Sequence, residues 1–154
     1  MPNIIYTKFF EQLANGAVDF DAVGTVVRCA AERDTSTYVA NKDHDFMGDT
    51  TGFIEITAAG YTRQTVATKA VNIDDANDRV ELDFDDISFG ASVAAGQTAN
   101  ELIFYVQTGG SDATPADDPL IARIDTATGL PAATGGGAFN VTIDAQGFLH
   151  LLQT

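Results

Sequence analysis

The stretch GYTRQTVATKAVNIDDANDRVELDFDDISFG, residues 60–90, decides the fold class of this chain. Its first half is rich in Thr, Val and Ile, which suit a pleated, half-buried strand, and this run contains Val66, Lys69, Val71 and Ile73. Residues 75–78, Asp-Ala-Asn-Asp, supply turn chemistry. Apolar and acidic residues then alternate over residues 80–85, and the alternation resumes at 87–89. We therefore predict a β-hairpin and a third strand in an antiparallel sheet with one wet, acidic face.

Short apolar or alternating runs recur along the rest of the chain, separated by clusters of Gly, Pro, Asp and Asn. They occupy residues 24–31, 53–57, 101–106, 120–125, 138–143 and 148–151. The run ELIFYV at 101–106 is the most apolar, so we predict that it forms the centre of a sheet. The segment Asp144-Ala145-Gln146-Gly147 between the last two runs predicts a second hairpin.

Helix is predicted only near the front of the chain, over residues 7–14, with Asn15-Gly16 as its stop. The long polar connection 32–52 has little periodicity, and we expect a single helical turn at Phe46 and Met47. Many short strands with turn-rich connections predict an all-β antiparallel sandwich, jelly-roll-like or immunoglobulin-like, with one short N-terminal helix. We expect one domain spanning residues 1–154.

The charge balance restricts the class of partner. Asp and Glu number 22 against 8 Lys and Arg, for a formal net charge of −14. This charge repels nucleic-acid backbones and anionic lipid, so we expect no nucleic-acid and no membrane partner. No secretory signal and no apolar run long enough for a bilayer is visible, so we expect synthesis in the cytoplasm. The lone Cys29 is interpreted as a small buried hydrophobe.

The sequence contains little that predicts chemistry. His44 lies between two aspartates, which suits either a divalent cation or a solvated loop, and we favour the loop. The acidic run 74–86 fails the spacing of an EF-hand, although Glu81, Asp83 and Asp85 share one strand face on which a cation could sit. No serine lies in a nucleophile elbow, and no glycine tract has phosphate-binding spacing. We therefore predict no catalytic residues, no cofactor and no metal.

The opening of the chain is unusually apolar for a terminus, which suggests two roles. It could dock on a partner protein, with help from the aromatic and thioether side chains of the long loop. The residues of this hypothetical partner interface are Ile4, Ile5, Tyr6, Phe9, Phe10, Phe46 and Met47. The alternative is that the segment plugs one open end of the chain's own sandwich.

An ordered set of motifs resembles a family of small bacteriophage and prophage virion structural proteins. The set comprises Tyr6-x-x-Phe-x-x-x-Leu-x-x-Gly, KDHDFMGD at 42–49, GYTRQTV at 60–66, NDRVELDFDDISF at 77–89 and FNVTIDAQGFLHL at 139–151. These motifs cover most of the chain in the family's order. The sequence departs from the family pattern at residues 29–33 and 92–100.

The resemblance implies a structural phage protein with no catalytic residues to carry over. We expect a capsid decoration (cement) protein on the virion surface that binds the major capsid protein, as a trimer or dimer following the shell symmetry. A tail or baseplate component is the first alternative. A small carbohydrate-binding or hydrolytic module is the second, and it ranks last because the chain has no Trp and only 4 Tyr for sugar stacking.

Overall fold

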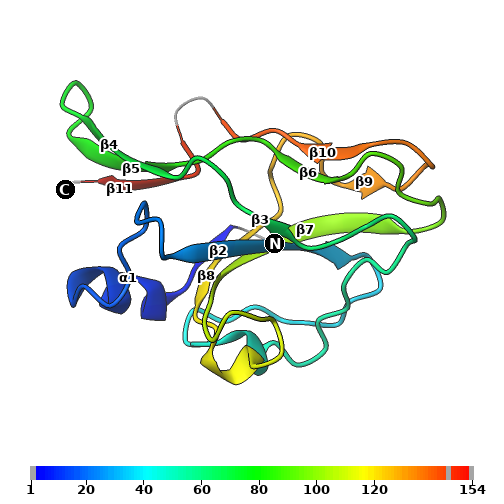
Figure 1. The fold of residues 1–154 in the computed structure, drawn as a ribbon, viewed down its shortest axis with the longest axis horizontal. Helices are drawn as coiled ribbons and strands as arrows, with labels where there is room; N and C mark the ends of the chain where they lie inside the picture. The colour runs from blue at the N-terminus through cyan, green and yellow to red at the C-terminus, as the bar shows by residue number, and fades with distance from the viewer. Residues whose placement is uncertain (1–2, 145–146, 153–154) are drawn as a thin grey trace.

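The computed structural model describes residues 3–144 and 147–152, and within them the chain is built mainly from antiparallel β-structure in two layers (Figure 1). Among these residues a large sheet of six strands has the order β1-β8-β7-β2-β3, with β9 also paired to β7. Its strands are β1 Ile4–Ile5, β2 Val26–Arg33, β3 Gln64–Thr65, β7 Thr98–Gln107, β8 Leu120–Ile124 and β9 Ala132–Ala133. The predicted all-β sandwich-like fold is confirmed.

Two smaller sheets form the opposite layer. The hairpin sheet has the order β11-β5-β4 and consists of β4 Ala70–Asp74, β5 Arg79–Asp83 and β11 Leu149–Leu152. The small sheet pairs β6 Ile87–Gly90 with β10 Phe139–Val141. Figure 1 shows both above the large sheet, with the β4–β5 hairpin extending over the side where α1 lies.

Helical structure is sparse, as expected. Helix α1 spans Thr7–Ala14, which are the predicted bounds, and the 3₁₀ turns are η1 Met47–Asp49 and η2 Pro115–Asp117. Helix α1 ends where Gly16 adopts a φ of 72°, which a side chain would strain. Among the described residues no helix has the length and apolarity needed to span a membrane.

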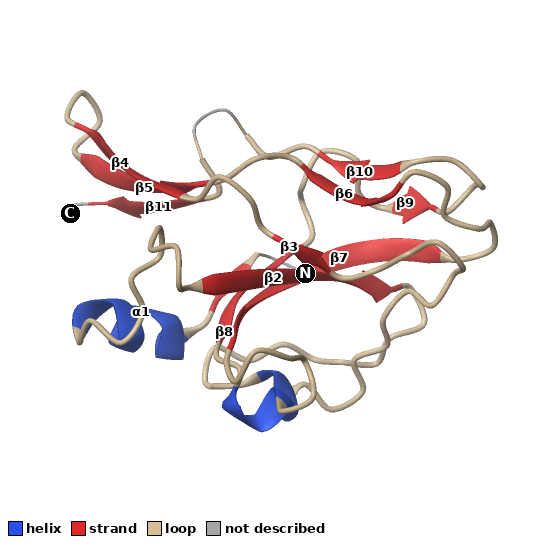
Figure 2. Cartoon of the chain, viewed as in Figure 1, coloured by secondary structure: helices blue, strands red, loops and turns tan. Residues whose placement is uncertain are grey.

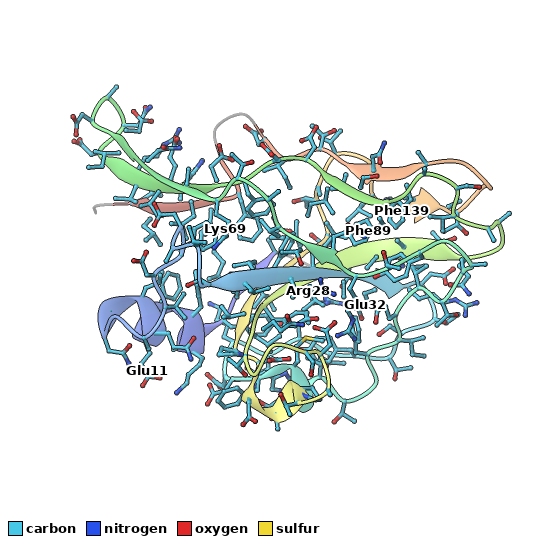
Figure 3. The ribbon with its side chains drawn as sticks, viewed as in Figure 1. Glu11, Arg28, Glu32, Lys69, Phe89 and Phe139 are labelled. Atoms are coloured by element: carbon cyan, nitrogen blue, oxygen red, sulfur yellow. The ribbon has the colours of Figure 1, made fainter. Side chains whose placement is uncertain are left out.

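The large sheet is buried on both faces, which explains the continuous apolar run of β7. One face meets the upper layer in the main core, which includes Val27, Leu102 and Phe104 from the large sheet and Phe89 and Phe139 from the small sheet. The last two rings stack with centroids 4.9 Å apart, and Figure 3 labels both. The other face carries a second cluster, whose buried members are Tyr6, Ala30, Tyr38, Met47, Ile103, Tyr105 and Leu120. Figure 2 shows the helical turns and the long loops on that side.

The predicted hairpin of residues 60–90 is confirmed. Strands β4 and β5 pair from Ala70↔Asp83 to Asp74↔Arg79, and residues 75–78 form the turn, where Asp78 adopts a φ of 50°. The third strand, β6, forms but pairs with β10 in the small sheet instead of continuing the hairpin. The apolar periodicity identifies these strands, whereas their hydrogen-bond partners depend on chain segments far away in the sequence.

One predicted hairpin and one predicted strand do not form. The hairpin predicted around residues 144–147 does not form, because β10 pairs with β6 whereas β11 pairs with β5, so the two strands belong to different sheets. The middle residues of that predicted turn, Ala145 and Gln146, lie outside the described residues. Residues 53–57 form no strand and make only an isolated bridge to β2, between Glu55 and Glu32. The run 101–106 is central as predicted, since β7 lies between β8 and β2.

A partly buried lysine connects the hairpin layer to the chain before β2. The Lys69 Nζ donates hydrogen bonds to the carbonyl oxygens of Phe20, Ala22 and Thr25 at 2.9, 2.9 and 2.5 Å. The lysine stands just before β4, and Figure 3 labels it beneath the upper layer. One ammonium group thereby supplies partners for three backbone acceptors of a loop that has no regular structure of its own.

We predict that Lys69→Met destabilises the fold by about 1.5–3 kcal/mol, because the three carbonyls lose a charged donor that water only partly replaces. Equilibrium unfolding in urea measures the change. The matched control is Lys42→Met, at an exposed lysine in the 32–52 connection, which should shift stability by about 0.5 kcal/mol or less. Equal effects of the two variants would contradict the role assigned to Lys69.

Candidate interaction surface

Three residues of the hypothetical partner interface are core residues of the chain itself. Tyr6 and Phe9 are 0% exposed and Met47 is 6% exposed. Phe9 packs in the main core, edge-on to Phe20 with ring centroids 6.5 Å apart. Tyr6 and Met47 belong to the second cluster. Tyr6, Phe9 and Met47 fill the interior of their own domain, so this structure leaves them almost no surface for a partner.

Polar contacts fix the N-terminal segment in place. The hydroxyl oxygens of Tyr6 and Tyr38 lie 2.9 Å apart, and the Tyr38 hydroxyl lies 2.9 Å from Nδ1 of His44. The Tyr6 backbone N–H donates to the carbonyl of Ile121 at 3.0 Å. Burial, reinforced by the hydrogen bond to Tyr38, raises the pKa of Tyr6 well above its ordinary value. The alternative role, in which the segment plugs its own domain, therefore holds for Tyr6 and Phe9.

The other four residues of that hypothesis remain accessible in part. Ile4 and Ile5 are half-buried in β1, where they pair with Arg123 and Ala122 of β8. Phe10 is 42% exposed on the outer side of α1. Phe46 is half-buried, and the Lys8 Nζ lies 5.9 Å from its ring centroid. Partner contact by these four stays a prediction.

An ion cluster occupies the outer face of the large sheet, under the long loops. Arg123 of β8 donates to Glu32 of β2 at 2.8 Å and also pairs with Glu101 of β7. Its guanidinium carbon lies 5.5 Å from the ring centroid of Tyr38. Arg123 and Glu32 are both buried, so the pair is costly to separate, and it joins β8 to β2 while the Tyr38 ring of the loop layer lies against Arg123. Figure 3 labels Glu32 on β2.

A second network extends along the same face. Arg63 Nε contacts both carboxylate oxygens of Glu55 at 2.8 and 2.9 Å, and its Nη1 donates to the Tyr105 hydroxyl at 2.9 Å. That hydroxyl donates to Asp112 at 2.6 Å, and Arg28 pairs with the same carboxylate at 3.1 Å. Both networks escaped the sequence analysis, because their members come from separate strands and loops. The only signal was the presence of charged residues inside apolar strand patterns.

The two networks pair acidic side chains with arginines. Each carboxylate in them faces an arginine that neutralises it, and no serine takes part. Burial raises the pKa of the Cys29 thiol well above its ordinary value, so the sulfur is a poor nucleophile. In the segment KDHDFMGD, residues 42–49, the His44 ring stacks on Tyr38 with ring centroids 5.6 Å apart, and its Nδ1 lies within hydrogen-bond distance of the Tyr38 hydroxyl. Within residues 3–144 and 147–152, no group of three or more His, Cys, Asp or Glu side chains is placed to hold a metal ion.

The strongest candidate for function is an apolar surface on the hairpin sheet. Cross-strand pairing places Val71, Leu82 and Leu149 in one row and Ile73, Val80 and Leu151 in the next, all on the face toward the large sheet. In the first row Leu82 and Leu149 are buried in the main core, whereas Val71 at the sheet edge is 41% exposed. The second row extends past the core, and Ile73 is 76% exposed. We call Val71, Ile73, Val80 and Leu151 the apolar overhang.

A groove of about 410 Å³ runs beneath the overhang. Its other wall comes from the end of α1 and the loop after it, and the lining residues are Leu13, Gly16, Val18, Asp19, Phe20, Val71, Val80, Leu82 and Leu151. Acidic side chains border this region, with Asp19 in the groove and Asp75 and Asp78 at the hairpin turn beside Ile73. The strand composition around Val71 and Ile73 predicts half-buried residues, because composition gives no sign that the hairpin extends beyond the opposite layer.

The acidic face of the hairpin is the reverse side of the overhang. Arg79 pairs with Asp74 at 3.0 Å and with Glu81 at 2.7 Å, which neutralises part of that face. A cation bridging Glu81, Asp83 and Asp85, the alternative left open by the sequence, gains no support from these contacts.

Comparison with known proteins gives no match to this chain among family models, curated proteins or solved structures.

We predict that Phe9→Ala destabilises the fold by about 3–5 kcal/mol, since it empties a fully buried site, whereas Phe10→Ala next to it costs about 1 kcal/mol or less. Urea unfolding of the two variants measures this difference. A larger cost at Phe10 than at Phe9 would mean that the opening segment does not plug the core.

We predict that Asp112 contributes its full stability above its unfolded-state pKa and loses that contribution as the pH falls through its lower folded-state pKa. Burial acts to raise the pKa of Asp112, but hydrogen bonds from Tyr105, Gln107 and Arg28 outweigh burial and hold the pKa below 3.8. A folded-state pKa below the unfolded value favours the fold at neutral pH, and the gain is lost as the pH falls through the folded-state pKa. Asp112→Asn should therefore cost on the order of 1.5 kcal/mol at pH 7.

The cost of Asp112→Asn should shrink as the pH falls from the unfolded-state pKa of about 3.8 toward the lower folded-state pKa, and it should vanish below the folded-state pKa, where the native carboxylate is itself protonated. Urea unfolding at a series of pH values measures this dependence. Asp43→Asn, at an exposed aspartate, is the control and should change stability at pH 7 by about 0.5 kcal/mol or less. A constant difference between Asp112→Asn and the parent chain at all pH values would contradict the assignment.

Proposed function

We propose that this chain is a bacteriophage capsid decoration protein that binds the major capsid protein and stiffens the shell. The observation that carries a binding function is the apolar overhang, which leaves Ile73 and Val71 exposed beside a groove. An exposed apolar surface on a chain with a net charge of −14 marks a contact site, because a partner that covers it removes apolar area from water. The ordered motifs that resemble small phage virion proteins supply the class of partner.

The arrangement of charge and apolar surface suits assembly onto a preformed lattice. Long-range attraction between an acidic protein and any basic strip on the shell speeds docking, and salt screens it with a Debye length of about 8 Å at physiological strength. Burial of exposed side chains of the size of Val71 and Ile73 contributes about 1.5–3 kcal/mol each and is not screened. A lattice repeats each contact, and we propose that the protein follows lattice symmetry as a trimer or dimer.

The polar clusters of the large sheet support a structural role over an enzymatic one. Their charged groups neutralise one another at distances of 2.8–3.1 Å, as in Arg123–Glu32, Arg63–Glu55 and Arg28–Asp112. Such pairs fix long loops on a sheet, which a protein exposed on a virion surface requires. We propose a non-enzymatic protein that needs no cofactor and no metal.

Purified particles of the parent phage test the location. Quantitative mass spectrometry and imaging by electron cryomicroscopy should find the chain in hundreds of copies on the head. A few copies at the tail would favour a tail or baseplate component. Absence from particles would overturn the virion assignment and favour a carbohydrate-binding or hydrolytic module.

We predict that Ile73→Lys reduces decoration of undecorated particles at least tenfold while leaving the fold intact, because the new charge cannot enter an apolar contact. The control is Val39→Lys, which changes a residue that is 71% exposed in the loop layer, away from the overhang. Co-sedimentation with particles measures binding, and thermal unfolding checks the fold. Decoration that survives Ile73→Lys but is lost in Val39→Lys would move the contact surface to the loops.

A further inference from the structure

The outer edge of strand β4 has no partner among the described residues. Strand β4 pairs with β5 on one side and ends the order β11-β5-β4 on the other. No backbone hydrogen bond joins Val71, Asn72 or Ile73 to any described segment other than β5. All three residues are exposed, and Figure 1 shows β4 at the outer margin of its layer. An edge strand directs alternate N–H and C=O groups outward, so β4 offers a row of open donors and acceptors.

Strand β4 is longer and more exposed than the edge strands of the large sheet and than β11 at the other edge of its own sheet. Strands β1 and β3, at the edges of the large sheet, are only two residues long each. At the opposite edge of the hairpin sheet, Leu149, His150 and Leu151 are buried or half-buried. Strand β4 runs for five residues in unbroken register, with no proline, lysine or bulge. The nearest lysine, Lys69, is turned away to bind the three carbonyls before β2. Proteins usually prevent further pairing at an edge strand by a proline, a lysine, a bulge, a cover or a very short strand.

The surface around the β4 edge determines what kind of strand it can accept. On the inner face, an added strand would place every second side chain over the groove next to Val71 and Ile73. Near the turn end, it would pass Asp74, Asp75 and Asp78. Arg79 pairs with Asp74 at 3.0 Å, so the acidic charge that faces solvent at this end comes mainly from the exposed Asp75 and Asp78. The site therefore favours a strand with apolar residues on one face and basic residues on the other.

A second copy of this chain is a poor occupant. Two β4 edges paired in parallel would bring the two sets of acidic turn residues opposite one another, and pairing in either direction would join two chains that each carry −14. Like charges placed opposite one another destabilise strand pairing. A basic segment of a different protein removes that repulsion and adds attraction.

We propose that β4 is a docking strand, onto which an extended segment of the partner protein adds by backbone pairing, with its apolar side chains in the groove and its lysines or arginines beside the acidic turn. This inference rests on the proposed binding function and names its mode of recognition. Backbone hydrogen bonds supply affinity in such strand addition, and the alternate side chains supply specificity.

Synthetic heptapeptides titrated into the full-length ¹⁵N-labelled chain test the proposal. The first peptide alternates Lys and Val, the second replaces each Lys by Glu, and the third keeps Lys and Val but carries an N-methyl group on its central amides. We expect the first peptide to shift the amide signals of residues 70–74 and of the groove, and to slow hydrogen exchange in β4. The Glu peptide and the N-methylated peptide should bind at least tenfold more weakly, since one reverses the charge and the other removes backbone donors.

Matched variants localise the effect. Ile73→Lys should abolish binding of the Lys–Val peptide, whereas Val39→Lys should leave it unchanged. Signal shifts confined to another surface, equal binding of the N-methylated peptide, or no binding of any peptide would overturn the docking-strand proposal.

Hydrogen exchange of the particle-bound protein separates this inference from the proposed function. If the chain decorates particles but β4 exchanges as fast as in the free protein, strand addition is wrong and the decoration function stands. If the Lys–Val peptide protects β4 but the chain is absent from particles, the decoration function is wrong and the docking strand stands.

Discussion

Burial of both faces of the large sheet is the constraint on which the rest of the structure depends. Strand β7 is buried from Leu102 to Val106 without interruption, so neither of its faces can meet water. The upper sheets cover one face, and the loops around residues 34–63 and 109–118 cover the other. An antiparallel sheet commonly leaves one face solvated. Here the second cover is made of loops, and the loops must be held down.

The two ion networks meet that need. The loops bury Tyr38 and Met47 in the second cluster, but their backbone groups lack the partners of regular structure, so specific bonds are needed to fix the rest of each loop. Arg123 with Glu32, and Arg63 with Glu55 and Tyr105, connect strand residues to one another and to loop residues at hydrogen-bond distance. The aromatic rings of Tyr38 and Tyr105 lie against these arginines, with cation-to-ring distances of 5.5 and 5.7 Å. Charge and packing thus act together on the loop side of the molecule.

The opposite layer is built differently, and that difference creates the candidate interaction surface. The small sheet lies over the core with Phe89 and Phe139, whereas the hairpin sheet continues beyond the core. Its row of Ile73, Val80 and Leu151 therefore has no opposite layer to cover it fully. Stability alone gives no reason to extend an apolar hairpin in this way. The proposed contact with a partner gives a reason for this extension, and the exposed edge of β4 adds a route for backbone pairing.

The sequence by itself determined the local structure of this protein, because local structure depends on neighbours along the chain. Period-two alternation and turn chemistry identified the hairpin of residues 60–90, the stop at Asn15-Gly16 marked the end of helix α1 over Thr7–Ala14, and the apolar run 101–106 indicated the central position of β7. Only the tertiary structure decided strand partners and exposure. The periodicity of β10 and β11 is the same whether they pair with each other or, as they do, with β6 and β5. Likewise Phe9 and Ile73 both read as apolar positions of regular elements, yet Phe9 is covered by the domain and Ile73 extends past it, because burial depends on which distant segments fold over a residue.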